Sequence, residues 1–147
     1  MKIPMKRWIF LFIVTLFLAA CGGQEAEPTE SSTEEVDVTN AVTVSDQAIG
    51  ADGTVTIDSV TADVDGWMVI HADDDGPGPV IGHAPVSAGE NSDVVVEVDA
   101  SQVTETLYAM LHVDAGVAGE YEFPGDDGPA RDAEGNVVTP PFMILSE

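Results

Sequence analysis

The stretch GWMVIHADDDGPGPVIGHAPV, residues 66–86, places short apolar runs on either side of a cluster of Asp, Gly and Pro. Residues 66–72 (GWMVIHA) and 79–83 (PVIGH) have the length and the Val, Ile and Trp content of β-strands. The Asp-Gly and Gly-Pro dipeptides between them are typical of turns. The stretch therefore predicts strands joined by turns.

The same alternation of short apolar runs with clusters of Gly, Pro, Asp and Asn extends from residue 41 to residue 146. Apolar residues nowhere in it keep a helical spacing for two turns. Seven or eight short strands at regular spacing in one domain predict an all-β fold, an antiparallel β-sandwich of the immunoglobulin-like or cupredoxin-like kind. An additional short strand at 121–123 and a minor helical stretch at 101–106 are alternatives for two of the connections. The predicted strands are 41–46, 54–62, 66–72, 79–83, 92–99, 105–114 and 137–146.

Alternation along these strands predicts which side chains share a face. Trp67, Val69 and His71 share one face of their strand, and we expect Trp67 to anchor the core. In the strand at 105–114, a row of small and aliphatic residues faces the core, and a second row lies on the opposite face: Tyr108, Met110, His112 and Asp114.

The first twenty residues have the layout of a secretory leader. Lys2, Lys6 and Arg7 form a positive region, and the thirteen residues 8–20 are almost wholly apolar. A helix needs roughly 17–25 residues to cross the hydrocarbon core of a bilayer, so a leader is favoured over a permanent membrane span.

The leader ends in Leu-Ala-Ala-Cys, residues 18–21, which resembles the lipobox of bacterial lipoproteins. The resemblance implies cleavage before Cys21, lipidation of Cys21 and anchoring of the chain to a lipid membrane. The segment 21–40 is polar and acidic, as expected of a disordered tether. We therefore expect an extracytoplasmic protein, lipid-anchored to the cell membrane or the outer membrane.

The charge of the chain is strongly negative, with 27 Asp and Glu against 4 Lys and Arg. Cleavage before Cys21 would leave Arg131 as the only Lys or Arg. Such a chain repels polyanions, so nucleic acid is not an expected partner. Its single cysteine, Cys21, excludes a disulfide, a catalytic thiol and a zinc–thiolate site within the domain.

Four segments together resemble an uncharacterised domain of secreted and surface proteins found in haloarchaea and some bacteria. They are DQ (46–47), GWMVIHADDDGPGPVIGHAPV (66–86), LYAMLHVDAG (107–116) and GEYEFPGDDGP (119–129). The resemblance covers roughly residues 41–146. It implies a β-sandwich-like module and no assigned chemistry.

Three histidines, His71, His83 and His112, are candidate metal ligands, together with Asp114. Asp73 and Asp114 each follow a histidine by two residues, and a carboxylate on the same strand face could orient an imidazole or bind the metal beside it. With methionines nearby in the sequence, copper or zinc is conceivable outside the cytoplasm. The competing interpretation is that strand-end histidines hydrogen-bond to a neighbouring loop.

The acid-glycine loops offer hard oxygen ligands of the kind that Ca²⁺ prefers. The candidate residues are Asp73, Asp75, Asp126 and Asp127. Asp-Gly is equally the ordinary chemistry of β-turns, and no EF-hand loop is complete.

No nucleophile elbow, zinc-protease motif, phosphate loop or dinucleotide fingerprint occurs, so an enzyme is not expected. The leading hypothesis is a membrane-anchored, non-enzymatic β-sandwich module without a cofactor that binds an envelope protein, a glycan or other envelope material. The alternative is an extracytoplasmic protein that binds copper, zinc or calcium through His and Asp side chains.

Overall fold

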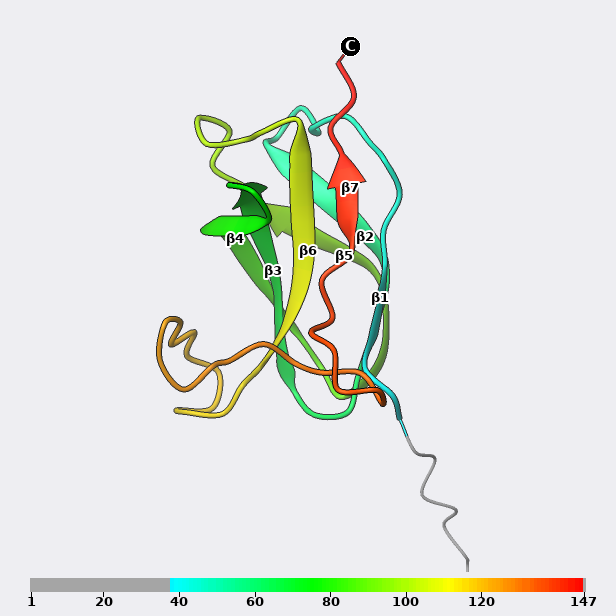
Figure 1. Ribbon diagram of the computed structural model, residues 1–147, viewed down its shortest axis with the longest axis vertical. Helices are drawn as coiled ribbons and strands as arrows, with labels where there is room; N and C mark the ends of the chain where they lie inside the picture. Colours follow the sequence, from blue (N-terminus) through cyan, green and yellow to red (C-terminus); the bar gives the residue numbers. More distant parts are fainter. Residues whose placement is uncertain (1–37, 147) are drawn as a thin grey trace, which may run out of the picture. The chain divides into compact units, whose positions relative to one another are not determined.

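The computed structural model describes residues 38–146, in which seven strands are formed (Figure 1). The leader, Cys21 and nearly all of the predicted tether lie outside the described residues. The strands are β1 (Ala41–Thr43), β2 (Thr54–Ala62), β3 (Gly66–Asp73), β4 (Pro77–Val86), β5 (Gly89–Glu97), β6 (Thr106–Val113) and β7 (Pro141–Met143).

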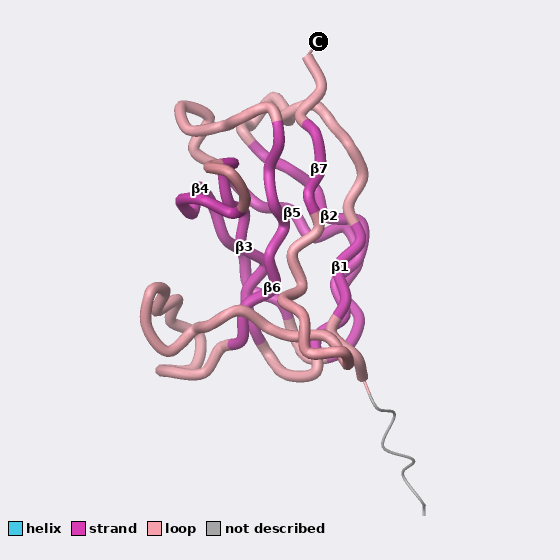
Figure 2. The backbone as a smooth tube through the Cα atoms, viewed as in Figure 1, coloured by secondary structure: helices cyan, strands magenta, loops and turns pink. Residues whose placement is uncertain are grey.

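The strands form two sheets, one in the order β1-β2-β5 and the other in the order β4-β3-β6-β7. Every pair of named strands is antiparallel. Figure 2 shows strands and loops alone, and the described part of the chain has no helix long and apolar enough to cross a membrane. The predicted all-β, antiparallel sandwich is confirmed.

The predicted strand positions agree with the structure in the middle of the chain and differ in the last third. The predicted strand 137–146 is reduced to Pro141–Met143. Pro140 and Pro141 lack the amide N–H that a longer sheet ladder would require. The predicted short strand at 121–123 and the helical alternative at 101–106 are both wrong, because these residues lie in loops and turns, except Thr106, which begins β6.

The main core lies between the two sheets and is built from the alternating rows that the sequence predicts. Along β2, Val55, Ile57 and Val60 are fully buried, and along β6 the row of Leu107, Ala109 and Leu111 faces them. The strands are held in register by ladders such as Val55↔Val96 and Met68↔Leu111. Burial of the aliphatic rows is the main source of stability for the sandwich.

Trp67 does not anchor this core, contrary to the prediction. Trp67, Val69 and Met110 are buried, yet they lie outside the cluster that fills the space between the sheets. They share the outer face of the four-stranded sheet, where Trp67 lies opposite His112. Seven of the eight residues of β3 are buried, so this strand is covered on both faces.

The cover on the outer face is the long loop 114–131, which follows β6 and crosses the ends of β3 and β6 in Figure 1. Its residues Tyr121 and Phe123 contact the rings of Trp67, His71 and His112. The loop therefore closes a second, smaller cluster of buried side chains on the far side of the sheet from the main core.

Candidate functional site

The outer face of the four-stranded sheet carries six rings, which we call the aromatic–histidine cluster. They come from β3, β4, β6 and the loop 114–131: Trp67, His71, His83, His112, Tyr121 and Phe123. Neighbouring ring centroids lie between 4.1 and 6.3 Å apart. Five of the six, all but Phe123, carry a nitrogen or oxygen that could serve a ligand, which makes this cluster the candidate site.

His71 and His112 lie side by side at the centre of the cluster, although they come from different strands. Their ring centroids are 5.8 Å apart, and the ring planes differ by 29°. His71 follows a register shift between β3 and β4, and such bulges commonly redirect a side chain. Both side chains are removed from solvent, with 3% of His71 and 0% of His112 exposed.

Each of these histidines has a ring nitrogen fixed by a backbone carbonyl. His71 Nδ1 lies 2.7 Å from the carbonyl oxygen of Gly78, and His112 Nδ1 lies 2.8 Å from that of Asp127. Because a carbonyl oxygen only accepts, both Nδ1 atoms must carry the proton. In the neutral ring Nε2 is then an unprotonated lone-pair donor. Both Nε2 atoms are buried and have no hydrogen-bond partner among the described residues.

The surroundings of His112 favour its neutral form. Burial lowers the pKa of His112, and the neighbouring His71 acts in the same direction. The carbonyl and the carboxylate of Asp127 oppose this and raise the pKa, but their effect is smaller in sum. A neutral imidazole is the form in which histidine binds a metal.

Two further polar atoms of the cluster are buried without a partner in the described structure: the Tyr121 hydroxyl and the Trp67 indole N–H. Burial, together with the nearby Asp127 carboxylate, raises the pKa of Tyr121 to about 12, so the phenol is protonated. Unpaired polar groups are uncommon in protein interiors, and four around one cluster require an explanation.

His83 belongs to the edge of the cluster and not to its centre. Its side chain is exposed, its ring stacks on Tyr121 with centroids 4.1 Å apart, and it meets Trp67 edge-on at 5.7 Å. Of the three histidines that the sequence singles out, the structure therefore brings His71 and His112 together and leaves His83 at the surface.

The prediction that Asp73 and Asp114 orient the histidines is wrong, because backbone carbonyls do so instead. Asp73 accepts hydrogen bonds from the Gly76 amide and the Tyr108 hydroxyl. Asp114 accepts one from the Gly119 amide at 2.7 Å. Both carboxylates stabilise turns next to the strands that carry the histidines.

The four calcium candidates lie at two separate places. Asp73 ends β3, and Asp75 lies in the turn between β3 and β4 with a positive φ of 55°. Asp126 and Asp127 lie in the loop 114–131, where Asp126 is exposed and Asp127 is fully buried. Within residues 38–146, no group of three or more His, Cys, Asp and Glu side chains is placed to hold a metal ion.

Asp127 has a role that the sequence did not reveal. Its Oδ1 accepts from the amides of Ala115 and Gly116, at 3.0 and 3.4 Å, and its Oδ2 accepts from the amide of Glu122 at 2.8 Å. These bonds lower the pKa of Asp127, with the Glu122 amide contributing most and burial opposing them. The Trp67 indole N–H adds to the effect from nearby without reaching hydrogen-bond geometry. Asp127 thus fastens the loop that covers the histidines.

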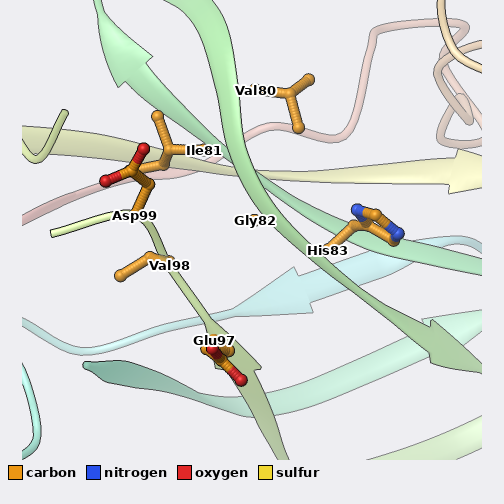
Figure 3. Close-up of a pocket in the computed structure, with 7 residues that line it drawn as sticks. All are labelled: Val80, Ile81, Gly82, His83, Glu97, Val98 and Asp99. Atoms are coloured by element: carbon orange, nitrogen blue, oxygen red, sulfur yellow. The ribbon is translucent and has the colours of Figure 1, made fainter. Parts of the chain in front are cut away.

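A shallow pocket lies where the edges of β4 and β5 meet, away from the buried histidines. It is lined by Val80, Ile81, Gly82, His83, Glu97, Val98 and Asp99 (Figure 3). In Figure 3, His83 and Asp99 lie on opposite sides of the pocket, with Glu97 between them. Hydrogen bonds from Ser101 and Gln102 already occupy Asp99 and lower its pKa. Of the two carboxylates in the pocket, Glu97 is therefore the one less engaged in hydrogen bonds to the rest of the fold.

Comparison with known proteins finds relatives at the cell surface. Over 104 residues, 69% of this chain, it is 38% identical to cell surface glycoprotein 2 of Haloarcula hispanica. It is 35% identical to cell surface glycoprotein 1 of the same organism over 104 residues. The matched region makes up 11% of the length of each relative. No solved structure matches the chain.

The family comparison agrees with these relatives and covers nearly all of the described residues. The model of the DUF7282 family, described as a domain of unknown function, matches residues 40–144. The predicted resemblance to an uncharacterised domain of haloarchaeal surface proteins is confirmed in this respect. This chain therefore belongs to the DUF7282 domain family.

Proposed function

We propose that this protein is a lipoprotein that presents its β-sandwich outside the cytoplasm as a non-enzymatic binding module for an envelope protein or glycan. The observation that carries the proposal is the match of one domain to a small part, 11%, of two large cell surface glycoproteins. A domain that is matched within two much longer surface proteins is suited to act as a module.

The arrangement of the buried histidines supports a module without catalytic activity. A histidine that activates a nucleophile is hydrogen-bonded to it and is oriented by a third group. In the described residues, Nδ1 of His71 and of His112 is bound to a backbone carbonyl, and no side chain reaches either Nε2. These two histidines therefore lack the partner that a general base needs.

The lipid anchor is tested by intact-mass measurement of the chain purified from a lipoprotein-processing host. We expect the wild-type chain to lack residues 1–20 and to carry the added mass of at least two acyl chains. The variant Cys21→Ser should keep residues 1–20 and carry no lipid, because the thiol that receives the lipid is gone. Gly23→Ser, two residues further on, should be processed like the wild type. An unmodified Cys21 in the wild-type chain would refute the anchor.

The partner is tested with residues 22–147 and purified cell-envelope fragments in molar salt, which screens repulsion between acidic surfaces. We expect saturable binding, with the β4–β5 edge pocket as the contact, because it combines apolar side chains with a free carboxylate. Glu97→Lys should then weaken binding about 10-fold, which corresponds to roughly 1.4 kcal/mol. Glu134→Lys makes the same charge change on a distant turn and should leave the dissociation constant within a factor of about 2.

Deglycosylated fragments distinguish the two kinds of partner in the same assay. Binding that survives deglycosylation indicates an envelope protein, and binding that is lost indicates a glycan. If neither native nor deglycosylated fragments bind saturably, the proposed module function is wrong. If Glu97→Lys binds like the wild type, the pocket is not the contact.

A further inference from the structure

We propose that His71 and His112 form a two-coordinate site for a single Cu(I) ion, bound between the Nε2 atoms of the two rings beneath Phe123. The first support is the state of the two nitrogens. Both are buried, both are fixed as lone-pair donors by the carbonyl bonds of Nδ1, and both lack a partner in the described residues.

The bonding of the two rings is the pattern found at metal-binding histidines. Such histidines almost always donate the other ring N–H to a carbonyl or carboxylate, which fixes the tautomer and the direction of the ring. Here Gly78, in β4, fixes His71, and Asp127, in the covering loop, fixes His112. The fold supplies these bonds whether or not an ion is bound, so the two rings are preorganised.

The separation of the rings suits one shared ion. Imidazole–metal bonds are ~2.0–2.1 Å long, so two nitrogens on one ion lie about 4 Å apart at most. Ring centroids 5.8 Å apart leave room for this arrangement. An ordinary pair of stacked histidines could have the same spacing, but it would leave both buried Nε2 atoms unsatisfied, which costs stability.

The number and charge of the ligands select the ion. Zn²⁺ in proteins is almost always four-coordinate, and residues 38–146 hold no group of three or more His, Cys, Asp and Glu side chains for a metal. The nearest buried carboxylate, Asp127, is already saturated by amide N–H groups. A dication among aromatic rings would carry one charge more than the Asp127 carboxylate compensates, and would be costly to bury. Cu(I) carries one charge and accepts two ligands, and imidazole is among the ligands that suit copper.

The rings around the pair favour a monovalent cation. The Phe123 ring meets both histidine rings at interplanar angles of 80° and 81°, with centroids 4.8 Å from His112 and 6.1 Å from His71. Aromatic rings attract cations, most strongly where water is excluded. Phe123 is itself 36% exposed, whereas the two histidines are buried.

The test is anaerobic competition for Cu(I) between the protein and a chromophoric Cu(I) chelator. The full chain is used in detergent with Cys21→Ser, because Cys21 is its only thiol and would bind Cu(I) itself. We expect one ion per chain with a submicromolar dissociation constant. His71→Gln and His112→Gln should each weaken binding at least 100-fold, whereas His83→Gln, on the same sheet face, should not change it. Zn²⁺ should bind at least 100-fold more weakly than Cu(I).

A second measurement avoids the risk that a buried substitution unfolds the domain. Long-range ¹H–¹⁵N correlation spectra of the imidazole rings report the protonation of each nitrogen in the folded Cys21→Ser chain. Before metal is added, Nε2 of His71 and of His112 should be unprotonated. One equivalent of Cu(I) should shift these two signals and leave His83 unchanged. Protonated Nε2 atoms, unchanged signals at saturating Cu(I), or equal affinity for Zn²⁺ would each overturn the proposal.

Discussion

Replacing Gly66 with alanine is expected to destabilise the domain by about 3 kcal/mol, the upper range for adding atoms to a packed interior. A Cβ at Gly66 would lie 2.2 Å from the backbone carbonyl oxygen of His112. That oxygen belongs to the neighbouring strand and cannot rotate away as a side chain could. β3 and β6 would have to separate, and the outer-face cluster depends on their register, in which Trp67 lies opposite His112.

The measurement is chemical denaturation of Gly66→Ala beside the wild type, in the same salt. The matched control is Gly128→Ala, because a Cβ at Gly128 meets nothing within 4 Å. Removing a glycine at such a position should leave the free energy of unfolding unchanged or raise it by ~0.5 kcal/mol. If Gly66→Ala proves as stable as Gly128→Ala, the close approach of β3 and β6 is not present in solution.

Removing the Asp127 carboxylate is expected to release the loop that covers the histidines. In Asp127→Ala, the amides of Ala115, Gly116 and Glu122 lose the acceptor that they share. Buried donors left unpaired are more costly than the mean strength of a hydrogen bond suggests. We expect the melting temperature to fall by roughly 10 °C.

The effect should be concentrated in the loop and the rings beneath it. Amide hydrogen exchange at Ala115, Gly116 and Glu122 should become faster, and the fluorescence of Trp67 should shift to longer wavelength as water reaches the indole. Asp126→Ala is the matched control, because Asp126 is the adjacent residue and its side chain is exposed. It should change stability by no more than ~0.5 kcal/mol. Equal effects of the two substitutions would mean that Asp127 does not hold the loop.

The period of two along the strands was enough to predict the sandwich and its inward faces. Val55 and Ile57, and likewise Leu107, Ala109 and Leu111, alternate with polar or larger residues, and the structure buries them between the sheets. This succeeds because alternation is a local property: successive side chains of a strand point to opposite faces whatever the rest of the chain does. The turns were equally local, since Asp, Gly and Pro favour them through their own backbone preferences.

The alternation of apolar residues along a strand does not indicate which segment of the chain covers each strand face. For this reason the prediction places Trp67 on the wrong side of the sheet. Residues 66–72 are apolar on both faces, which is the signal of a strand buried on both sides. The covering loop 114–131 has no repeating pattern of its own. Its position depends on Asp127, whose acceptor role is indistinguishable in the sequence from that of a turn aspartate.

The sequence by itself determined the all-β class, the antiparallel sandwich and the residues that share each strand face. It also identified His71 and His112 as candidate metal ligands. Only the tertiary structure decided that these two histidines meet and that His83 lies at the exposed edge of their cluster. The two histidines are 41 positions apart along the chain. The β3–β6 register places both on the outer face, four positions apart along the paired strands, and their rings approach to 5.8 Å beside the bulge at His71 and the loop fastened by Asp127. Each of these depends on contacts between distant segments, which exist only once the sheets have formed.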